Sequence, residues 1–309
     1  MVPGYREIRE LGTGSGGRVV LATYTGTGAY VAIKYLHAPS RADERSMARL
    51  RERVRVLVGL DDPHIVRLYE YYEDVLEAAL VMELVDGVAL RRVLSGHGAT
   101  TPEAALAVLK GVLLGLARAH EAGVPHGDCR AENILIRADG TGGLTDFGVA
   151  APAAPGAPAE PPAEEAADVR AAARVFVECL TGRPYPQDPP GTAAHRRQAG
   201  PLPAGVVPEP VRRLARHAPA GGPADRPPVA RALAGELETA ASAVYGPEWE
   251  RRGRRHLAER ATRFALDFPL AGPVPGGASR TEAPAARRAA GRAGGPLRAL
   301  PGSRILTGA

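Results

Sequence analysis

Hydrophobic and polar residues alternate in short runs through the first quarter of the chain, a pattern that predicts β-strands. The strands predicted in this way are 5–11, 19–22, 30–35, 66–72 and 79–84. Residues 41–60 differ, because they are rich in charge and their apolar residues recur at helical spacing. These apolar positions are Met47, Leu50, Val54, Leu57 and Val58. The first part of the chain is therefore predicted to be β-rich with one helix.

The pattern becomes helical after the turn Asp86-Gly87. Thr101 followed by Pro102 is a helix start, since a threonine side chain can cap the first turn and proline suits the first helical position. Helices are predicted at 101–122, 168–180, 210–217 and 229–244, with a small β-region at 126–136 and 144–149. The order indicates an α+β fold, in which a mostly β lobe precedes a mostly α lobe.

The last 65 residues divide into a predicted helix and a predicted tail. Residues 245–269 carry an apolar stripe on an arginine-rich helix, and we expect this helix to pack back onto the preceding lobe. The stripe consists of Trp249, Leu257, Ala261, Phe264 and Phe268. Residues 270–309 are rich in Ala, Gly, Pro and Arg, so a disordered tail is expected there. The predicted units are thus 5–84, 85–244, 245–269 and 270–309.

The net charge of +5 comes from this tail, which holds six arginines and the single acidic residue Glu282. The rest of the chain is formally neutral, which argues against a nucleic-acid partner. Cys129 and Cys179 lie far apart without metal-ligand spacing, so neither a disulfide framework nor a cysteine metal site is expected. No transmembrane segment and no secretion signal are recognised. A cytoplasmic location is the resulting expectation.

The rarest residues carry the strongest chemical information. The chain has one asparagine, Asn133, and two lysines, of which Lys34 ends the run VAIK in a predicted strand. Asn133 follows Asp128 in the run HGDCRAEN. Almost all cationic residues of this chain are arginines and it has a single asparagine, yet a lysine and that asparagine occur at these two positions. We therefore expect both groups to serve a nucleotide site.

A glycine-rich turn lies between the first two predicted strands. Residues 12–19, GTGSGGRV, have Gly12, Gly14 and Gly17 at G-x-G-x-x-G spacing. Such a hairpin can lie close over a polyphosphate, because no side chains intervene and its amides can point at the oxygens. An ordinary hairpin would have the same glycines, so this motif alone is weak. Its strand-turn-strand setting argues against a dinucleotide fold, in which the glycines open a helix.

Two carboxylates and one carboxamide follow in the second half of the chain. Asp128 and Asn133 are five residues apart, and Asp146 begins an Asp-Phe-Gly run. Transfer of a γ-phosphoryl group needs one carboxylate to orient or deprotonate the attacking hydroxyl, and it needs oxygen ligands for Mg²⁺. Asp128 can fill the first role, and Asn133 with Asp146 the second. Weak motifs in this order and spacing make strong joint evidence.

The chain resembles the eukaryotic-type Ser/Thr protein kinases of bacteria over about residues 5–240. The resemblance implies a bilobal fold and an ATP- and Mg²⁺-dependent enzyme that phosphorylates a hydroxyl of an unknown protein. It implies Asp128 as the catalytic base, with Lys34 and Arg130 at the phosphates and Asn133 and Asp146 on the metal. The nucleotide-binding positions that it implies are Gly12, Gly14, Gly17, Val19, Ala32, Lys34, Met82, Glu83, Val85 and Leu135. Leu57, Leu68, His126 and Phe147 would form a stacked hydrophobic spine joining the lobes.

Several positions depart from the family pattern. Arg53 stands where the family places the helix glutamate that pairs with the strand lysine, and Glu52 is its neighbour. Either the helix turns to bring Glu52 to Lys34, or Lys34 lacks that partner and faces a like charge. Gly127 replaces an arginine that grips a phosphorylated loop, and no Ser, Thr or Tyr occurs in 148–180. We therefore expect no activation-loop phosphorylation.

Two alternative functions remain open at this stage. The first is a pseudokinase that binds nucleotide and serves as a regulator or scaffold, favoured by Arg53 and by the short segment 148–168. The second is a small-molecule kinase of the aminoglycoside-phosphotransferase type, which shares the His126-Gly127-Asp128 run and needs no peptide-binding shelf. The retained Lys34 and Asp128 favour an active protein kinase over the first alternative, and the glycine loop favours it over the second.

Overall fold

The computed structural model describes residues 1–14, 16–37, 44–74, 77–147, 161–185 and 230–265. Its N-terminal part is a five-stranded antiparallel sheet with the strand order β1-β2-β3-β5-β4. The strands are β1 (Tyr5–Gly14), β2 (Gly17–Tyr24), β3 (Tyr30–Leu36), β4 (Leu68–Glu73) and β5 (Ala78–Glu83). Each lies within a few residues of a predicted strand, since the hairpin turns follow the glycines of the sequence.

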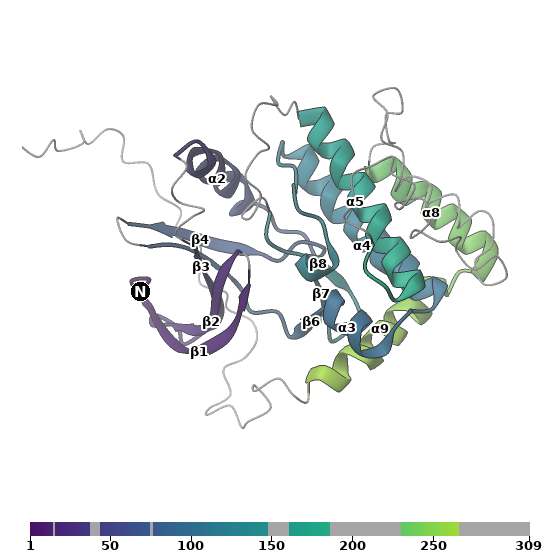
Figure 1. The fold of residues 1–309 in the computed structure, drawn as a ribbon, viewed down its shortest axis with the longest axis horizontal. Coiled ribbons are helices and arrows are strands. Elements are labelled where there is room, and N and C mark those ends of the chain that lie inside the picture. The colour runs from purple at the N-terminus through teal and green to yellow at the C-terminus, as the bar shows by residue number, and fades with distance from the viewer. Residues whose placement is uncertain (15, 38–43, 75–76, 148–160, 186–229, 266–309) are drawn as a thin grey trace, which may run out of the picture.

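One helix, α2 (Glu44–Leu57), packs beside β4 of this sheet (Figure 1). Met47, Leu50, Val54 and Leu57 are all buried, as their helical spacing predicts. The helix ends three residues before the predicted boundary of 60, and Gly59 follows its last turn. Its apolar face therefore covers the sheet, while its many arginines lie at the flanks.

A small three-stranded sheet lies between the large sheet and the helices that follow (Figure 1). It consists of β6 (Gly87–Ala89), β7 (Ile134–Arg137) and β8 (Gly142–Leu144), and a single 3₁₀ turn, Ala131–Asn133, precedes β7. The sequence predicted a longer β-region, 126–136 and 144–149. The loop before β7 is instead shaped by hydrogen bonds to other elements, which a local pattern does not reveal.

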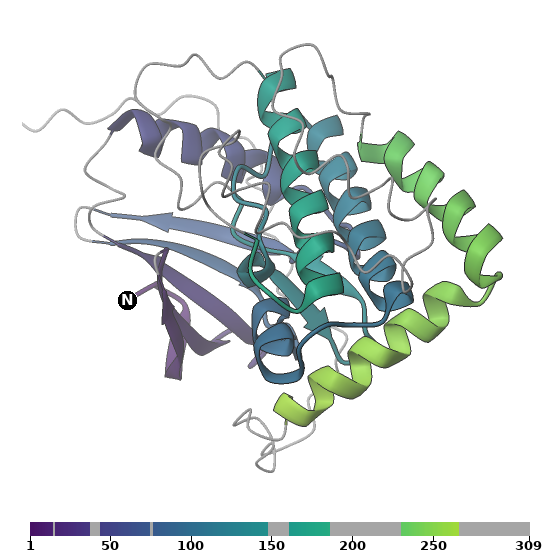
Figure 2. The ribbon, with the colours of Figure 1, turned by 45° about the vertical axis from the view of Figure 1, so that its right-hand side comes forward.

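The second part is helical and surrounds α4 (Pro102–Glu121), whose threonine cap is present, with Thr101 Oγ1 accepting from Ala104 N–H at 3.2 Å. α4 packs against three other helices (Figure 2). These are α5 (Pro161–Thr181), α8 (Ala230–Tyr245) and α9 (Trp249–Ala265), and the short α3 (Leu90–His97) lies nearer the small sheet. The α+β fold with a β-rich lobe and a helical lobe is thus confirmed.

The last helix, α9, runs across the helical part as an integral layer (Figure 2). Trp249 and Leu257 are fully buried, and a Cβ on Gly253 would stand 2.4 Å from the carbonyl oxygen of Glu103 in α4. Lys110 of α4 binds Glu238 and Glu250 at 2.6 Å each, which fixes α8 and α9 together. The described part of the predicted stripe therefore packs onto the helical part, whereas Phe268 lies outside the described residues.

Two helices differ from the predicted pattern. α5 begins at Pro161, seven residues before the predicted start, because proline suits a first turn and the following Ala and Glu residues favour helix. α3 was missed because it is only eight residues long. The predicted helix 210–217 and the tail 270–309 lie outside the described residues. Among the helices that are described, none has an apolar stretch sufficient to span a bilayer.

Candidate functional site

Lys34 lies in the middle of the large sheet and faces the site beneath it. Its neighbours across the sheet are Val19 on β2 and Leu80 on β5. The side chain is only 6% exposed, and its Nζ lies 2.8 Å from Oδ1 of Asp146. A buried ammonium is costly unless a charge of the opposite sign compensates it. Asp146 supplies this charge, although it lies 112 positions later in the sequence.

Asp146 has an unusual backbone conformation, with φ at +66°, where it is the one non-glycine residue with positive φ among the described residues. Thr145, just before it, is held on both sides: its N–H donates to the Asn133 carbonyl at 3.0 Å, and its own carbonyl accepts from His126 Nε2 at 3.0 Å. Strained backbone persists only where the surroundings determine it, and it clusters at functional sites. These contacts aim the Asp146 carboxylate at Lys34.

Residues 126–133 form a loop, called here the 126–133 loop, that is anchored by one buried carboxylate of α5. Asp168 accepts the backbone N–H of His126 at 2.7 Å and that of Gly127 at 2.8 Å. The same carboxylate binds His120 Nε2 at 2.9 Å. Asp168 is 2% exposed, so these hydrogen bonds replace water entirely. The loop is fixed by the core of the helical part.

The His126 ring organises the loop from within. Its Nδ1 accepts the N–H of Asp128 at 3.2 Å, and its Nε2 donates to the Thr145 carbonyl, so the neutral ring satisfies both contacts. Complete burial lowers the pKa of His126, although the charge of Asp168 opposes this effect. The ring also lies against Phe147, with centroids 4.4 Å apart. His126 and Phe147 thus contact each other as the resemblance implied.

Asp128 and Asn133 meet within the loop. Asn133 Nδ2 donates to both the carbonyl and the Oδ2 of Asp128, at 2.9 Å each. The amide nitrogen of Asn133 is therefore committed to Asp128, and its oxygen remains available as a ligand. A carboxamide oxygen and a carboxylate are both oxygen donors of the kind that binds Mg²⁺ together with substrate phosphates. The described residues contain no group of three or more His, Cys, Asp or Glu that could enclose a metal alone.

Arg130 belongs to a chain of ion pairs beside the loop. Its Nε binds Glu132 at 2.9 Å, Glu132 also binds Arg91 of α3 at 3.0 Å, and Arg91 reaches Glu178 of α5 at 2.5 Å. Burial raises the pKa of Glu132, but the hydrogen bonds from Arg130 and Arg91 outweigh it and lower the pKa to about 2. Burial raises the pKa of Glu178. The sequence did not predict this network, because Arg91 lies 41 positions from Glu132 and 87 positions from Glu178 along the chain.

The three glycines of the β1–β2 hairpin that match the G-x-G-x-x-G spacing, Gly12, Gly14 and Gly17, serve different needs. A Cβ on Gly17, whose φ is +136°, would lie 1.8 Å from the Tyr35 carbonyl oxygen, so the fold itself requires glycine there. A Cβ on Gly12 or Gly14 would meet nothing within 4 Å. Protein packing therefore does not explain these two, and the open space leaves room for a ligand to approach the hairpin backbone. Ser15, between them and Gly17, is not described.

The residues expected around an adenine ring come from both parts of the molecule. Ala32 and Met82 are neighbours across β3 and β5, while Val19 and Leu135 are partly buried and pack against the same core. The structure adds a contact that the sequence analysis missed. The Glu83 carboxylate binds Arg137 through both guanidinium nitrogens, the longer bond being 3.1 Å, and thereby joins β5 to β7.

Val85 is the remaining expected position. Its side chain is buried, and it lies after β5 in the sequence. It is therefore on the connection between the two parts of the molecule. The Glu83 N–H donates to the Arg67 carbonyl at 2.8 Å. The connection is therefore held by both backbone and side-chain contacts.

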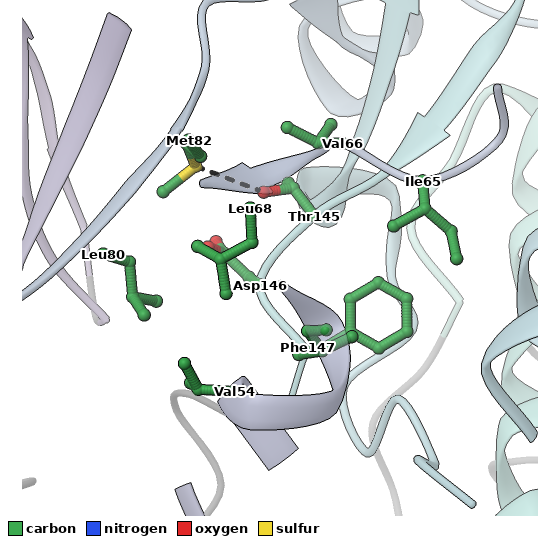
Figure 3. A pocket seen from close by; sticks show the side chains of 10 residues that line it. Val54, Ile65, Val66, Leu68, Leu80, Met82, Thr145, Asp146 and Phe147 are labelled. Atoms are coloured by element: carbon green, nitrogen blue, oxygen red, sulfur yellow. Dashed lines mark hydrogen bonds between the residues drawn. The ribbon is translucent and has the colours of Figure 1, made fainter. Parts of the chain in front are cut away.

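An apolar cavity lies behind Lys34 and Asp146 (Figure 3). Val54 and Leu57 of α2 form one wall, and Leu80 and Met82 of β5 lie on the sheet side. Its volume of about 30 Å³ has room for one or two water molecules. Thr145 Oγ1 donates to Met82 Sδ at 3.9 Å at its edge. Nearly dry surroundings strengthen the attraction between Lys34 and Asp146.

The contacts of Glu52 and Arg53 on α2 show which group faces Lys34. Glu52 points outward, is 71% exposed, and pairs with Arg55. Arg53 turns to Glu164 in the first turn of α5, with Nη2 to Oε2 at 3.1 Å. Lys34 therefore lacks the α2 glutamate partner, as the second of the two expectations for Lys34 stated, but it faces the Asp146 carboxylate and not a like charge. The segment 148–160, for which no phosphorylation is expected, lies outside the described residues.

Comparisons with known proteins agree with this geometry. The family model described as protein kinase domain matches residues 5–167. The chain is 33% identical over 253 residues to the serine/threonine-protein kinase PknL of Mycobacterium bovis, covering 74% of this chain and 63% of that protein. It is 31% identical over 292 residues to PknH of Mycobacterium tuberculosis, covering 88% of this chain and 46% of that protein. The chain thus spans between about half and two thirds of these relatives.

A solved structure resembles the fold as well. The crystal structure of the Mycobacterium tuberculosis PknI kinase domain superposes with a TM-score of 0.63 and 26% identity, over 78% of this chain and 98% of that domain. Residues 5–167, which the family model matches, contain the glycine hairpin, Lys34, the 126–133 loop and Asp146. On the family model and these relatives together, the chain belongs to the protein kinase family.

Proposed function

We propose that this chain is an ATP-dependent serine/threonine protein kinase that transfers the γ-phosphoryl group to a hydroxyl of a protein substrate. The observation that carries the proposal is the 2.8 Å contact between Lys34 and Asp146, in which two chemically demanding residues from separate lobes meet. Lys34 is one of only two lysines in the chain, and within the described residues the carboxylate of Asp146 compensates the burial of its ammonium.

Each group has a distinct role in the proposed transfer. Lys34 binds the α- and β-phosphates, and the hairpin amides around Gly12 and Gly14 cover them. Asp128, held by Asn133, orients the attacking hydroxyl and receives its proton. Arg130 adds positive charge near the γ-phosphate, through a planar fork rather than the point charge of a lysine. Positioning and charge neutralisation supply most of the acceleration in such reactions.

Mg²⁺ is the implied metal, and the oxygen donors of Asn133 and Asp146 fit it. When bound with the nucleotide, Mg²⁺ neutralises negative charge on the phosphates. The chain's own contribution is to hold those donors: Asn133 through its amide contact with Asp128, and Asp146 through its contact with Lys34. A hydrogen bond thus orients Asn133, and an ion pair orients Asp146.

A nucleotide-binding regulator without transfer is the second candidate, favoured by one observation. Arg53 points to Glu164, so α2 contributes no carboxylate to Lys34. The retained Asp128, Asn133 and Asp146 favour an active enzyme over this candidate. The family match and the named relatives favour a protein substrate over a small molecule.

The test is Mg²⁺-dependent transfer of labelled γ-phosphate, first without added substrate and then with a generic basic protein. We expect transfer by the wild type and a loss of at least about a hundredfold in Asp128→Asn. Asp61→Asn is the matched control, because Asp61 is exposed and lies outside the site. Equal transfer by wild type and Asp128→Asn would refute the assignment of the base. No transfer by the wild type would favour the regulator.

A further inference from the structure

Two arginines flank the apolar face of α2 and bind different parts of the molecule. Each helical residue turns the side-chain direction by about 100°, so Arg51 and Arg53 lie on either side of the buried stripe of Leu50 and Val54. Arg51 holds Glu73 at the end of β4 through two bonds of 2.7 and 2.8 Å. Arg53 holds Glu164 of α5 at 3.1 Å. One flank of α2 is therefore tied to the sheet, and the other to the helical lobe.

Glu164 shares its side of α5 with the anchor of the 126–133 loop. Glu164 and Asp168 are four residues apart, so their side chains lie one above the other on the helix. Asp168 holds the backbone of His126 and Gly127. Two successive turns of α5 thus bind α2 and the loop that carries Asp128. The position of α2 is linked by this route to the position of Asp128.

The position of α2 matters because its apolar face closes the cavity behind the site. Val54, the residue after Arg53, and Leu57 line that cavity together with Asp146 and Phe147 (Figure 3). The cavity has room for only one or two water molecules and is lined by Asp146, so an outward shift of α2 would admit more water beside the Lys34–Asp146 pair. Water weakens an ion pair by raising the local dielectric constant. Fixing α2 therefore preserves the arrangement of Lys34 and Asp146.

We propose that Arg53 and Glu164 form a positioning ion pair, which fixes α2 against α5 and so holds Lys34 and Asp146 in their catalytic arrangement. This inference rests on the proposed kinase function. In the family, this position on α2 holds a glutamate that pairs with the strand lysine. Here α2 instead supplies the cation, Arg53, and α5 supplies the acid, Glu164. Because residues 148–180 contain no Ser, Thr or Tyr, α2 is positioned by residues already encoded in the chain, without a phosphoryl group.

The experiment compares Arg53→Ala, Glu164→Ala and the charge-exchanged double variant Arg53→Glu/Glu164→Arg with the wild type. Arg55→Ala is the matched control, because Arg55 lies on the same helix, is 70% exposed and pairs only with Glu52 in the described contacts. Phosphate transfer to a basic protein is resolved into kcat and the KM for ATP. Hydrogen exchange of the amides of residues 47–57 is measured on the same proteins.

We expect each single alanine variant to lower kcat about five- to tenfold with the KM for ATP changed less than about twofold, since the pair is partly exposed and orders the site rather than binding nucleotide. The double variant should recover most of kcat, and Arg55→Ala should match the wild type. Amides of 47–57 should exchange faster in both single variants and be protected again in the double variant.

Three outcomes would overturn the inference: unchanged exchange in Arg53→Ala, equal loss in Arg55→Ala, or no recovery in the double variant. Inactivity of the wild type is a different result. It would refute the proposed kinase function, and the exchange data would then decide alone whether Arg53 and Glu164 fix α2.

Discussion

The two sides of the candidate site are held by contacts of very different kinds. On the loop side, the backbone of His126 and Gly127 is bound by Asp168, whose carboxylate is buried and fully hydrogen-bonded. On the α2 side, the ties are two arginine–glutamate pairs, each partly open to solvent. Hydrogen bonds from backbone to a buried carboxylate allow little movement, whereas partly exposed side-chain pairs bend and are weakened by salt.

This difference indicates that the loop side of the site is held rigidly, whereas the position of the α2 side can change more easily. Asp128 and Asn133, which must meet the reacting groups, lie on the strongly held side. Lys34 and Asp146 join the two sides, and their geometry depends on both. The four predictions below test this contrast, from the largest expected effect to the smallest.

Removal of the Asp168 carboxylate should release the 126–133 loop. Asp168→Ala leaves the N–H of the buried His126 and that of the more exposed Gly127 without their carboxylate partner, so we expect a loss of about 3 to 5 kcal/mol of unfolding free energy, together with loss of any transfer. Urea unfolding measures it. Asp61→Ala, at an exposed ion pair, should change stability by less than about 0.5 kcal/mol. A similar effect of both variants would contradict the contrast.

Loss of the ammonium tests the residue that joins both sides. Lys34→Met keeps the length and apolar stem of the side chain but removes the charge, so we expect transfer to fall by at least about a hundredfold, or about 3 kcal/mol of barrier. Circular dichroism should show an intact fold. Full activity of this variant would contradict the role of Lys34, and so would equal loss in Lys110→Met, the other lysine, which binds Glu238 and Glu250.

Acid should weaken the ion pairs of Glu132 beside the loop. The pKa of Glu132 is lowered from 4.5 to about 2 in the fold, so its carboxylate stabilises the protein fully above pH 4.5, and this contribution is lost as the pH falls toward 2. We therefore expect Glu132→Gln to reduce the melting temperature at pH 7 and to flatten its dependence on pH between 4.5 and 2. The control is Glu259→Gln, at an exposed pair of α9. Parallel pH profiles for wild type and Glu132→Gln would contradict this prediction.

The smallest effect should come from the sheet-side tie of α2. Arg51→Ala removes the two bonds to Glu73, yet the pair is about one third exposed, so we expect a loss of about 0.5 to 1 kcal/mol that shrinks as salt is added. Thermal unfolding at low and high ionic strength measures this. A cost as large as that of Asp168→Ala would show that the α2 side is held as firmly as the loop side.

The sequence predicted the site better where chemistry restricts the residue type. Lys34, Asn133 and Asp128 were predicted because few residues can serve as ammonium, carboxamide and carboxylate in phosphoryl transfer, and the structure brings Asn133 against Asp128 and Lys34 against Asp146. The strands were found because half-buried strands alternate. The fold class followed from the order of these elements.

Other features could not be predicted, because they depend on contacts distant in sequence. The Arg53–Glu164 pair joins residues 111 positions apart, and the Arg91–Glu178 pair joins residues 87 apart. Nothing local to Arg53 marks Glu164 as its partner. The early start of α5 was hidden differently, since proline-rich segments usually indicate loops, and only the helical Ala and Glu residues after Pro162 oppose that reading.

The buried Trp249 bears on where this molecule can be divided. The family match ends at residue 167, yet Trp249 is fully buried, Gly253 touches the backbone of α4, and a Cβ on Gly140 would collide with the carbonyl of Arg254. A fragment trimmed at residue 167, or anywhere before α9, would expose apolar surface of α4 that α9 now covers. We expect such a fragment to be prone to aggregation, because the folded unit extends beyond the region that the family model matches.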